Sequence, residues 1–107
     1  MKYRIIWTNT ARNDFHQIID YLIEKWGKTS AYKFSSKVTK QLELISSLPQ
    51  LYPKTEVREN IRKCIITEQV SLYYQDIKED KEILVIRLFD NRRSLDKLEE
   101  ALNNSDL

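Results

Sequence analysis

Two amphipathic helical patterns meet at Gly27, the only glycine among the 107 residues, and this meeting point constrains the fold more than any other feature. The apolar residues before it recur at helical spacing and form one stripe: Ala11, Phe15, Ile18, Ile19, Leu22, Ile23 and Trp26. The second stripe follows it: Ala31, Phe34, Val38, Leu42, Ile45 and Leu48. A glycine at a helix end adopts the left-handed conformation at little cost. The pattern predicts a helical hairpin whose apolar inner faces cover another layer.

Polar residues beside the two helices are placed to cap them. Thr8 or Thr10 can cap the first helix, because a threonine hydroxyl accepts a hydrogen bond from a free backbone N–H group. Thr29 or Ser30 can do the same for the second helix. Pro49 predicts where the second helix ends, since the residue before a proline disfavours helical conformation.

The remaining segments have the composition of short β-strands. One precedes the hairpin and three follow it, at residues 3–7, 61–67, 70–77 and 82–89. The polar connections between the last three are short enough to join antiparallel neighbours. Helical spacing returns after residue 94 and predicts a short C-terminal helix. We therefore expect an α+β fold of order β-α-α-β-β-β, with the helical hairpin on one face of a small, mainly antiparallel sheet.

Length and composition limit the class of protein. A chain of 107 residues has room for one hydrophobic core, so we expect a single domain over residues 1–107. No run approaches the roughly 18 apolar residues that a membrane-spanning helix needs, and no signal-peptide pattern is present. We expect a cytoplasmic protein with no membrane partner. The single cysteine, Cys64, is expected to be a small buried residue rather than a catalytic thiol.

The sequence lacks the usual motifs of metal-dependent or cofactor-dependent chemistry. The chain has no histidines or carboxylates at metal-ligand spacing and no glycine-rich phosphate loop, so we expect no cofactor. His16, the only histidine, lies beside the apolar stripe of the first helix and is expected on a helix face. Metal-free ribonuclease chemistry stays open, because arginine, lysine and tyrosine can orient a phosphate and stabilise its developing charge.

Basic residues gather near the second and fourth expected strands, although the net charge is only +2. Arg62 and Lys63 lie at the start of the second strand, and Arg92 and Arg93 follow the fourth. Guanidinium groups on one rim of a sheet suit phosphate or carboxylate partners. Acidic neighbours such as Asp90 leave the alternative that these charges are simply solvated and balanced.

Period-two alternation divides the last strand into two faces. The face expected to meet the helices holds Leu84, Ile86 and Leu88. The other face holds Ile83, Val85, Arg87 and Phe89. An arginine among apolar side chains is costly to bury without a partner, and such a face is unfavourable in water. We expect the final helix or another protein to cover it.

These features together resemble the RelE/ParE superfamily of bacterial type II toxin–antitoxin toxins, over about the whole chain. The resemblance rests on the element order and on three segments: I-I-D-Y-L-I-E-K-W-G-K-T-S-A-Y-K-F (18–34), V-S-L-Y-Y-Q (70–75) and I-L-V-I-R-L-F-D-N-R-R (83–93). The first segment looks especially like ParE. The resemblance implies a growth-inhibiting toxin, with a cognate antitoxin that wraps a tail around the sheet and helices. A homodimer is compatible with it.

The two branches of this superfamily act on different targets. RelE-like members cut mRNA on the ribosome with an arginine in the third strand, another after the fourth and a tyrosine in the last helix. ParE-like members lack this set and poison DNA gyrase. Here Ser71 replaces the third-strand arginine, no tyrosine follows Phe89, and Arg92 or Arg93 matches the remaining arginine. The resemblance favours a non-enzymatic gyrase inhibitor, with an mRNA endonuclease and an inactive antitoxin-binding module as the alternatives.

Charge pattern and resemblance together give three groups of candidate residues. The expected target-binding residues are Arg87, Arg92 and Arg93. The candidates for catalysis, in a RelE-like enzyme, are Arg92, Arg93, Arg62 and Lys63. The expected antitoxin-binding or self-association surface is formed by Ile83, Val85, Arg87 and Phe89.

Overall fold

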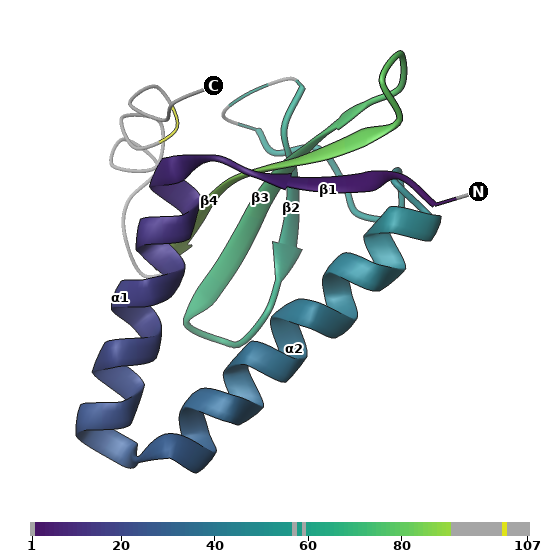
Figure 1. The fold of residues 1–107 in the computed structure, drawn as a ribbon. Helices are drawn as coiled ribbons and strands as arrows, with labels where there is room; N and C mark the ends of the chain where they lie inside the picture. The colour runs from purple at the N-terminus through teal and green to yellow at the C-terminus, as the bar shows by residue number, and fades with distance from the viewer. Residues whose placement is uncertain (1, 57, 59, 91–101, 103–107) are drawn as a thin grey trace.

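The computed structural model describes residues 2–56, 58, 60–90 and 102 of the chain. Its elements are β1 (Arg4–Trp7), α1 (Asn9–Trp26), α2 (Lys28–Ser47), β2 (Arg62–Ile65), β3 (Val70–Ile77) and β4 (Glu82–Asp90). Figure 1 shows α1 and α2 as a V-shaped hairpin beside one twisted sheet. The predicted α+β fold and its element order are confirmed. The predicted C-terminal helix falls outside the described residues, except for Leu102.

The strands lie in the order β1-β4-β3-β2. The pairs β2–β3 and β3–β4 are antiparallel, as their short connections predict, whereas β1 runs parallel to β4. This arrangement puts β4 between two neighbours, and α1 packs against it. Consequently Ile83, Val85 and Ile86 of β4 are fully buried.

The junction between the helices depends on the backbone of Gly27. Its φ of 95° and ψ of 173° form a conformation that residues with a side chain rarely adopt. Its N–H donates to the carbonyl oxygens of Leu22 and Ile23, which closes α1. Gly27 is also the N-cap of α2, so the prediction that Thr29 or Ser30 caps this helix is wrong.

The start of α1 is capped by a side chain. The Thr8 hydroxyl accepts a hydrogen bond from the backbone N–H of Ala11 at 3.0 Å. Of the two threonines that the sequence offers, Thr8 is therefore the cap, and Thr10 lies inside the helix. The same Thr8 hydroxyl donates to the carbonyl oxygen of Ile86 at 3.0 Å, which ties the beginning of α1 to the central strand.

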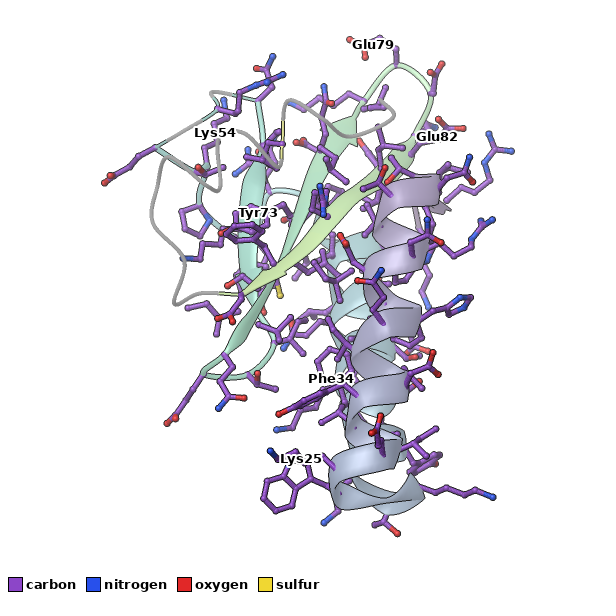
Figure 2. All side chains as sticks on the ribbon, turned by 90° about the vertical axis from the view of Figure 1, so that its left-hand side faces the viewer. Lys25, Phe34, Lys54, Tyr73, Glu79 and Glu82 are labelled. Atoms are coloured by element: carbon purple, nitrogen blue, oxygen red, sulfur yellow. The ribbon has the colours of Figure 1, made fainter. Side chains whose placement is uncertain are left out.

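The main core lies between the hairpin and the sheet. Its buried members are Ala11, Phe34, Val38, Leu42, Ile45, Cys64, Ile66, Leu72, Tyr74, Ile83, Val85 and Leu88. A second cluster consists of Ile61, Tyr73, Ile86, Phe89 and Leu102. Figure 2 shows Tyr73 on the side of the sheet that faces away from the helices. The neighbours Tyr73 and Tyr74 therefore lie on opposite faces of the sheet, as successive residues of a β-strand do.

The two faces of β4 differ from the prediction in the first half of the strand. Ile83 and Val85 lie under the helices, whereas Leu84 and Ile86 pack with the second cluster. The register then shifts, because Tyr73 pairs with Arg87 while Tyr74 pairs with Val85, which leaves Ile86 as an extra residue. Such a bulge interrupts strict alternation.

The residues beyond the bulge follow the prediction again, with Leu88 under the helices and Phe89 in the second cluster. The four residues predicted as an antitoxin-binding or self-association surface, Ile83, Val85, Arg87 and Phe89, nevertheless do not lie together on one exposed face. The three apolar members are 0%, 0% and 5% exposed, and they divide between two clusters. In the described structure these three side chains pack within the protein's own core.

Candidate functional site

The helical hairpin extends past the end of the sheet (Figure 1). At its base the apolar stripes are buried, and both Ala11 and Ile45 are 0% exposed. Near Gly27 the large side chains are exposed instead: Tyr21 56%, Ile23 41%, Trp26 66% and Tyr32 73%. Exposed apolar and aromatic side chains in one region mark a surface for a partner. The sheet is too short to cover the whole stripe that the sequence predicts.

A groove of about 610 Å³ lies between this hairpin and the ends of β3 and β4. Its apolar lining includes Ile18, Leu22, Phe34, Val70 and Leu88. Its polar lining includes Gln17, Ser30, Thr67 and Gln69. In Figure 2, Phe34 lies at the level of the hairpin where the strands end. A concave, largely apolar surface with a few polar groups is typical of a binding site.

Two lysines of α2 lie at the edge of this groove. Lys33 and Lys37 are one helical turn apart and exposed. Within the described part of the chain, neither lysine has an ion-pair partner. The two carboxylates that line the groove are already engaged, because Asp14 binds Arg87 and Asp90 has an interaction of its own. Among the described residues of the lining, Arg87 and the two lysines outnumber Asp14 and Asp90, so the groove has a small excess of positive charge there.

Arg87 is held by Asp14 of α1. Its Nε donates to Asp14 Oδ2 at 2.8 Å and its Nη2 donates to Asp14 Oδ1 at 3.0 Å. The backbone N–H of Leu88 also donates to Asp14 Oδ2, at 3.1 Å. This bidentate pair ties the end of β4 to α1. The sequence predicts that the final helix or another protein covers this arginine, and the structure shows that α1 supplies a carboxylate partner for it.

Asp14 is a structural residue that the sequence interpretation missed. It lies 73 residues from Arg87, and no local pattern joins two positions so far apart. The sequence indicates this partner of Arg87 only indirectly. An arginine in an otherwise apolar strand needs a carboxylate, and Asp14 is the acidic residue one helical turn before Ile18 of the buried stripe.

Arg62 is also engaged within the fold. Its Nε donates to Asp76 Oδ1 at 3.3 Å, and its Nη1 donates to the carbonyl oxygen of Tyr52 at 2.7 Å. The Arg62 side chain is only 12% exposed. It connects β2, β3 and the loop that precedes β2. Lys63 is half-buried and pairs in register with Tyr73.

Cys64 is fully buried behind a small polar cluster. Its thiol donates to Gln41 Oε1 at 3.6 Å, and the hydroxyl of Tyr52 donates to the same oxygen. Burial raises the pKa of the Cys64 thiol to about 11, so the thiol is protonated at neutral pH. Burial also raises the pKa of Tyr74 to about 12, and its hydroxyl donates to the carbonyl oxygen of Pro49 at 2.9 Å. The expectation that Cys64 is a buried packing residue is confirmed.

The other predicted positions divide into two groups. Arg92 and Arg93 lie outside the described residues. His16 is exposed on α1, on a helix face as expected, with its ring centroid 6.2 Å from that of Phe15. Among the residues that the structure describes, no group of histidine, cysteine or carboxylate side chains could hold a metal ion, and no helix could span a membrane.

Comparisons with known proteins agree with this architecture. A family model described as the ParE toxin of the type II toxin–antitoxin system parDE matches residues 5–103. The chromosomal ParDE system of P. aeruginosa contains a chain with a TM-score of 0.69 and 20% identity, over 83% of this chain and 96% of that chain. A mutant of the E. coli toxin RelE gives a TM-score of 0.66 and 19% identity, over 96% and 97% of the two chains.

The RelBE2 toxin–antitoxin complex of Mycobacterium tuberculosis contains a third similar chain, with a TM-score of 0.60 and 17% identity, over 85% of this chain and 100% of that chain. A comparison with curated protein sequences gives no match. At these identities the structural likenesses establish the fold, and they include both branches of the superfamily. The fold alone therefore does not separate the two activities.

Proposed function

The chain belongs to the ParE toxin family of type II toxin–antitoxin systems, and from this membership we propose that it arrests growth by acting on DNA gyrase. We propose further that its cognate antitoxin neutralises it by occupying the groove beneath the helical hairpin. The toxin role follows from the family. The target and the antitoxin-binding surface rest on the particular residues described above.

One observation favours gyrase over mRNA as the target. Ser71 occupies the third-strand position where RelE-like toxins have an arginine, and it is 0% exposed in β3, opposite Phe89. This position therefore offers no charge and no access to an RNA phosphate. Arg62, which could have replaced that arginine, is committed to Asp76 and Tyr52. The environments of Ser71 and Arg62 therefore favour a protein target over an RNA substrate that the toxin would cleave.

The surface of the hairpin supports the proposal for the antitoxin. The groove and the overhanging side chains of Tyr21 and Trp26 present a concave apolar surface beside large aromatic groups. Buried aromatic side chains commonly supply much of the binding energy of a protein interface. An antitoxin segment in this place would cover the part of the stripe that the sheet leaves open.

Arg92 and Arg93 remain the proposed contacts to the target. Their guanidinium groups stay charged at all physiological pH values and bind carboxylates or phosphates in a fixed geometry. Both groups occur in a gyrase–DNA complex. Arg87, by contrast, is assigned to the fold because Asp14 neutralises it.

The proposed target can be tested by inducing the toxin and pulse-labelling DNA, RNA and protein. A gyrase-directed toxin stops DNA synthesis first, and the purified protein inhibits DNA supercoiling by gyrase. An early stop of protein synthesis with cleaved mRNA would instead identify the RelE-like activity. Normal growth with folded, soluble toxin would identify an inactive antitoxin-binding module.

The matched variants for this experiment are Arg92→Ala with Arg93→Ala, and His16→Ala as the control. Melting temperatures show that each variant is folded. The double arginine variant should lose growth inhibition, whereas His16→Ala should keep it. Full toxicity of the folded double variant would reject the two arginines as target contacts and leave the choice of target to the labelling result.

A further inference from the structure

The charges at the edge of the groove indicate what kind of segment fills it. We propose that Lys33 and Lys37 select an acidic, amphipathic segment of the antitoxin, whose apolar side chains enter the groove while its carboxylates pair with the two lysines. This inference rests on the proposed function, which assigns the groove to the antitoxin. It adds the residues that discriminate between one antitoxin segment and another.

The lining of the groove requires an apolar side to the segment. Ile18 and Leu22 of α1 line it together with Phe34 of α2, and Val70 and Leu88 line it from β3 and β4. Phe34 and Leu88 are already buried in the core, whereas Ile18, Leu22 and Val70 are half-buried. Covering these three removes apolar surface from water, which favours association in proportion to the area buried. Tyr21 also lines the groove and is 56% exposed, so the apolar surface continues from the groove onto the overhang.

The edge of the groove requires negative charge. Asp14 and Arg87 neutralise each other, and neither Lys33 nor Lys37 has an ion-pair partner among the described residues, so the two lysines supply the excess positive charge of the lining. A neutral segment that covered these lysines would remove water from them without offering a partner, which is unfavourable. A basic segment would be repelled. An acidic segment is the one that compensates both charges.

The spacing of the lysines limits the arrangement of the acidic residues. Residues one helical turn apart have Cβ atoms roughly 5–6 Å apart and point the same way. Two carboxylates on one side of the antitoxin segment, at a similar separation, can therefore bind both lysines together. A nucleic acid is a poorer occupant, because its affinity depends on many phosphate contacts. Among the described lining residues, the only cations without an ion-pair partner are Lys33 and Lys37, and the lining is largely apolar.

The experiment uses the purified toxin and the purified antitoxin encoded beside it. Lys33→Glu with Lys37→Glu reverses the charge at the groove, and Lys54→Glu with Lys78→Glu makes the same change at exposed positions outside the groove and outside the helical hairpin. Affinity is measured by isothermal titration and folding by melting temperature. We expect the groove reversal to weaken binding on the order of tenfold to hundredfold, because two attractions become repulsions. The control reversal should change affinity less than about threefold.

Two further measurements identify the partner groups. Lys33→Gln with Lys37→Gln removes the attraction without repulsion, and its affinity should depend less on salt than that of the unmodified toxin. Carbodiimide cross-linking should join Lys33 or Lys37 to aspartate or glutamate side chains of the antitoxin. Changing those acidic residues to lysine should restore binding to the reversed toxin.

The possible outcomes distinguish the role of Lys33 and Lys37 from the proposed pairing of this toxin with its antitoxin. Equal affinity of the unmodified and the groove-reversed toxin for the antitoxin would overturn the inference and leave the toxin–antitoxin pair intact. Failure of the antitoxin to bind or neutralise the unmodified toxin would reject the proposed pairing, and the inference with it. Binding of the toxin to DNA or RNA that depends on Lys33 and Lys37 would also overturn the choice of an acidic protein segment.

Discussion

The base and the tip of the helical hairpin have the same amphipathic pattern but different surroundings. At the base, Ala11 of α1 and Ile45 of α2 are completely buried against the sheet. At the tip, Trp26 continues the stripe of α1 and is 66% exposed, because the strands end before they reach it. One pattern therefore serves the core at one end and leaves an open surface at the other.

This difference separates stability from recognition. Side chains at the base lose contacts in every direction when they are truncated, so they should control the free energy of unfolding. Side chains at the tip and around the groove have water on one side, so they should matter little until a partner covers them. Substitutions along the hairpin can therefore locate this division, and their effects on stability should decrease from the base of α2 to the buried thiol.

The largest effect is expected at the base of α2. Ile45→Ala should lower the free energy of unfolding by about 3–4 kcal/mol, because it removes buried methyl groups and leaves a cavity. Trp26→Ala at the tip removes a larger side chain but should lower it by less than about 1 kcal/mol. Urea unfolding of both variants checks the comparison. Equal losses would show that the tip is packed in solution.

A somewhat smaller effect is expected where α1 meets β4. Asp14→Ala should lower the free energy of unfolding by about 2–4 kcal/mol, because it leaves the Arg87 guanidinium and the Leu88 N–H without their carboxylate. The control is Asp20→Ala, an exposed carboxylate on the same helix. Denaturant unfolding should show little change for the control. A harmless Asp14→Ala would contradict a structural role for the pair.

The turn between the helices should show a moderate effect. Gly27→Ala should lower the free energy of unfolding by about 1–2 kcal/mol, because φ at this position is 95°. No atom lies within 4 Å of the position that a Cβ would take, so the cost arises from the backbone alone. Lys28→Ala is the neighbouring control. Thermal unfolding that is unchanged in Gly27→Ala would mean that the turn can adopt another conformation.

The smallest effect appears only at high pH. Burial raises the pKa of the Cys64 thiol from 9.0 to about 11, so between these values the folded protein holds a proton that the unfolded chain releases. Stability should therefore fall as the pH rises through this window. Buried tyrosines titrate at similar pH, so the measurement is the difference in urea stability between the native protein and Cys64→Ala. A constant difference from pH 8 to 11 would contradict the raised pKa.

Local features of the fold could be predicted from the sequence. The apolar spacing and Gly27 place both helices within a residue or two of their observed ends, since helical periodicity depends on neighbours only a few residues apart. The faces of β4 could not be assigned in the same way. Both alternating sets are mostly apolar, and the bulge at Ile86 arises only when β4 pairs with β3.

The candidate site was less predictable because it depends on contacts that are distant in sequence. The pair of Asp14 and Arg87 spans 73 residues, and the groove exists because the hairpin is longer than the sheet. Neither the ion pair nor the groove can be predicted from the residues of a single segment. The roles of Arg92 and Arg93 stay predictions from charge and resemblance.

Hydrogen–deuterium exchange of the toxin, alone and bound to its antitoxin, tests the division between base and tip most directly. The antitoxin should slow exchange in residues 18–37, which form the tip and both helical walls of the groove. Exchange in residues 38–47 should already be slow in the free toxin and change little. Protection confined to the base, or to the face of the sheet around Tyr73, with residues 18–37 unchanged, would contradict the assignment of the groove as the antitoxin-binding surface.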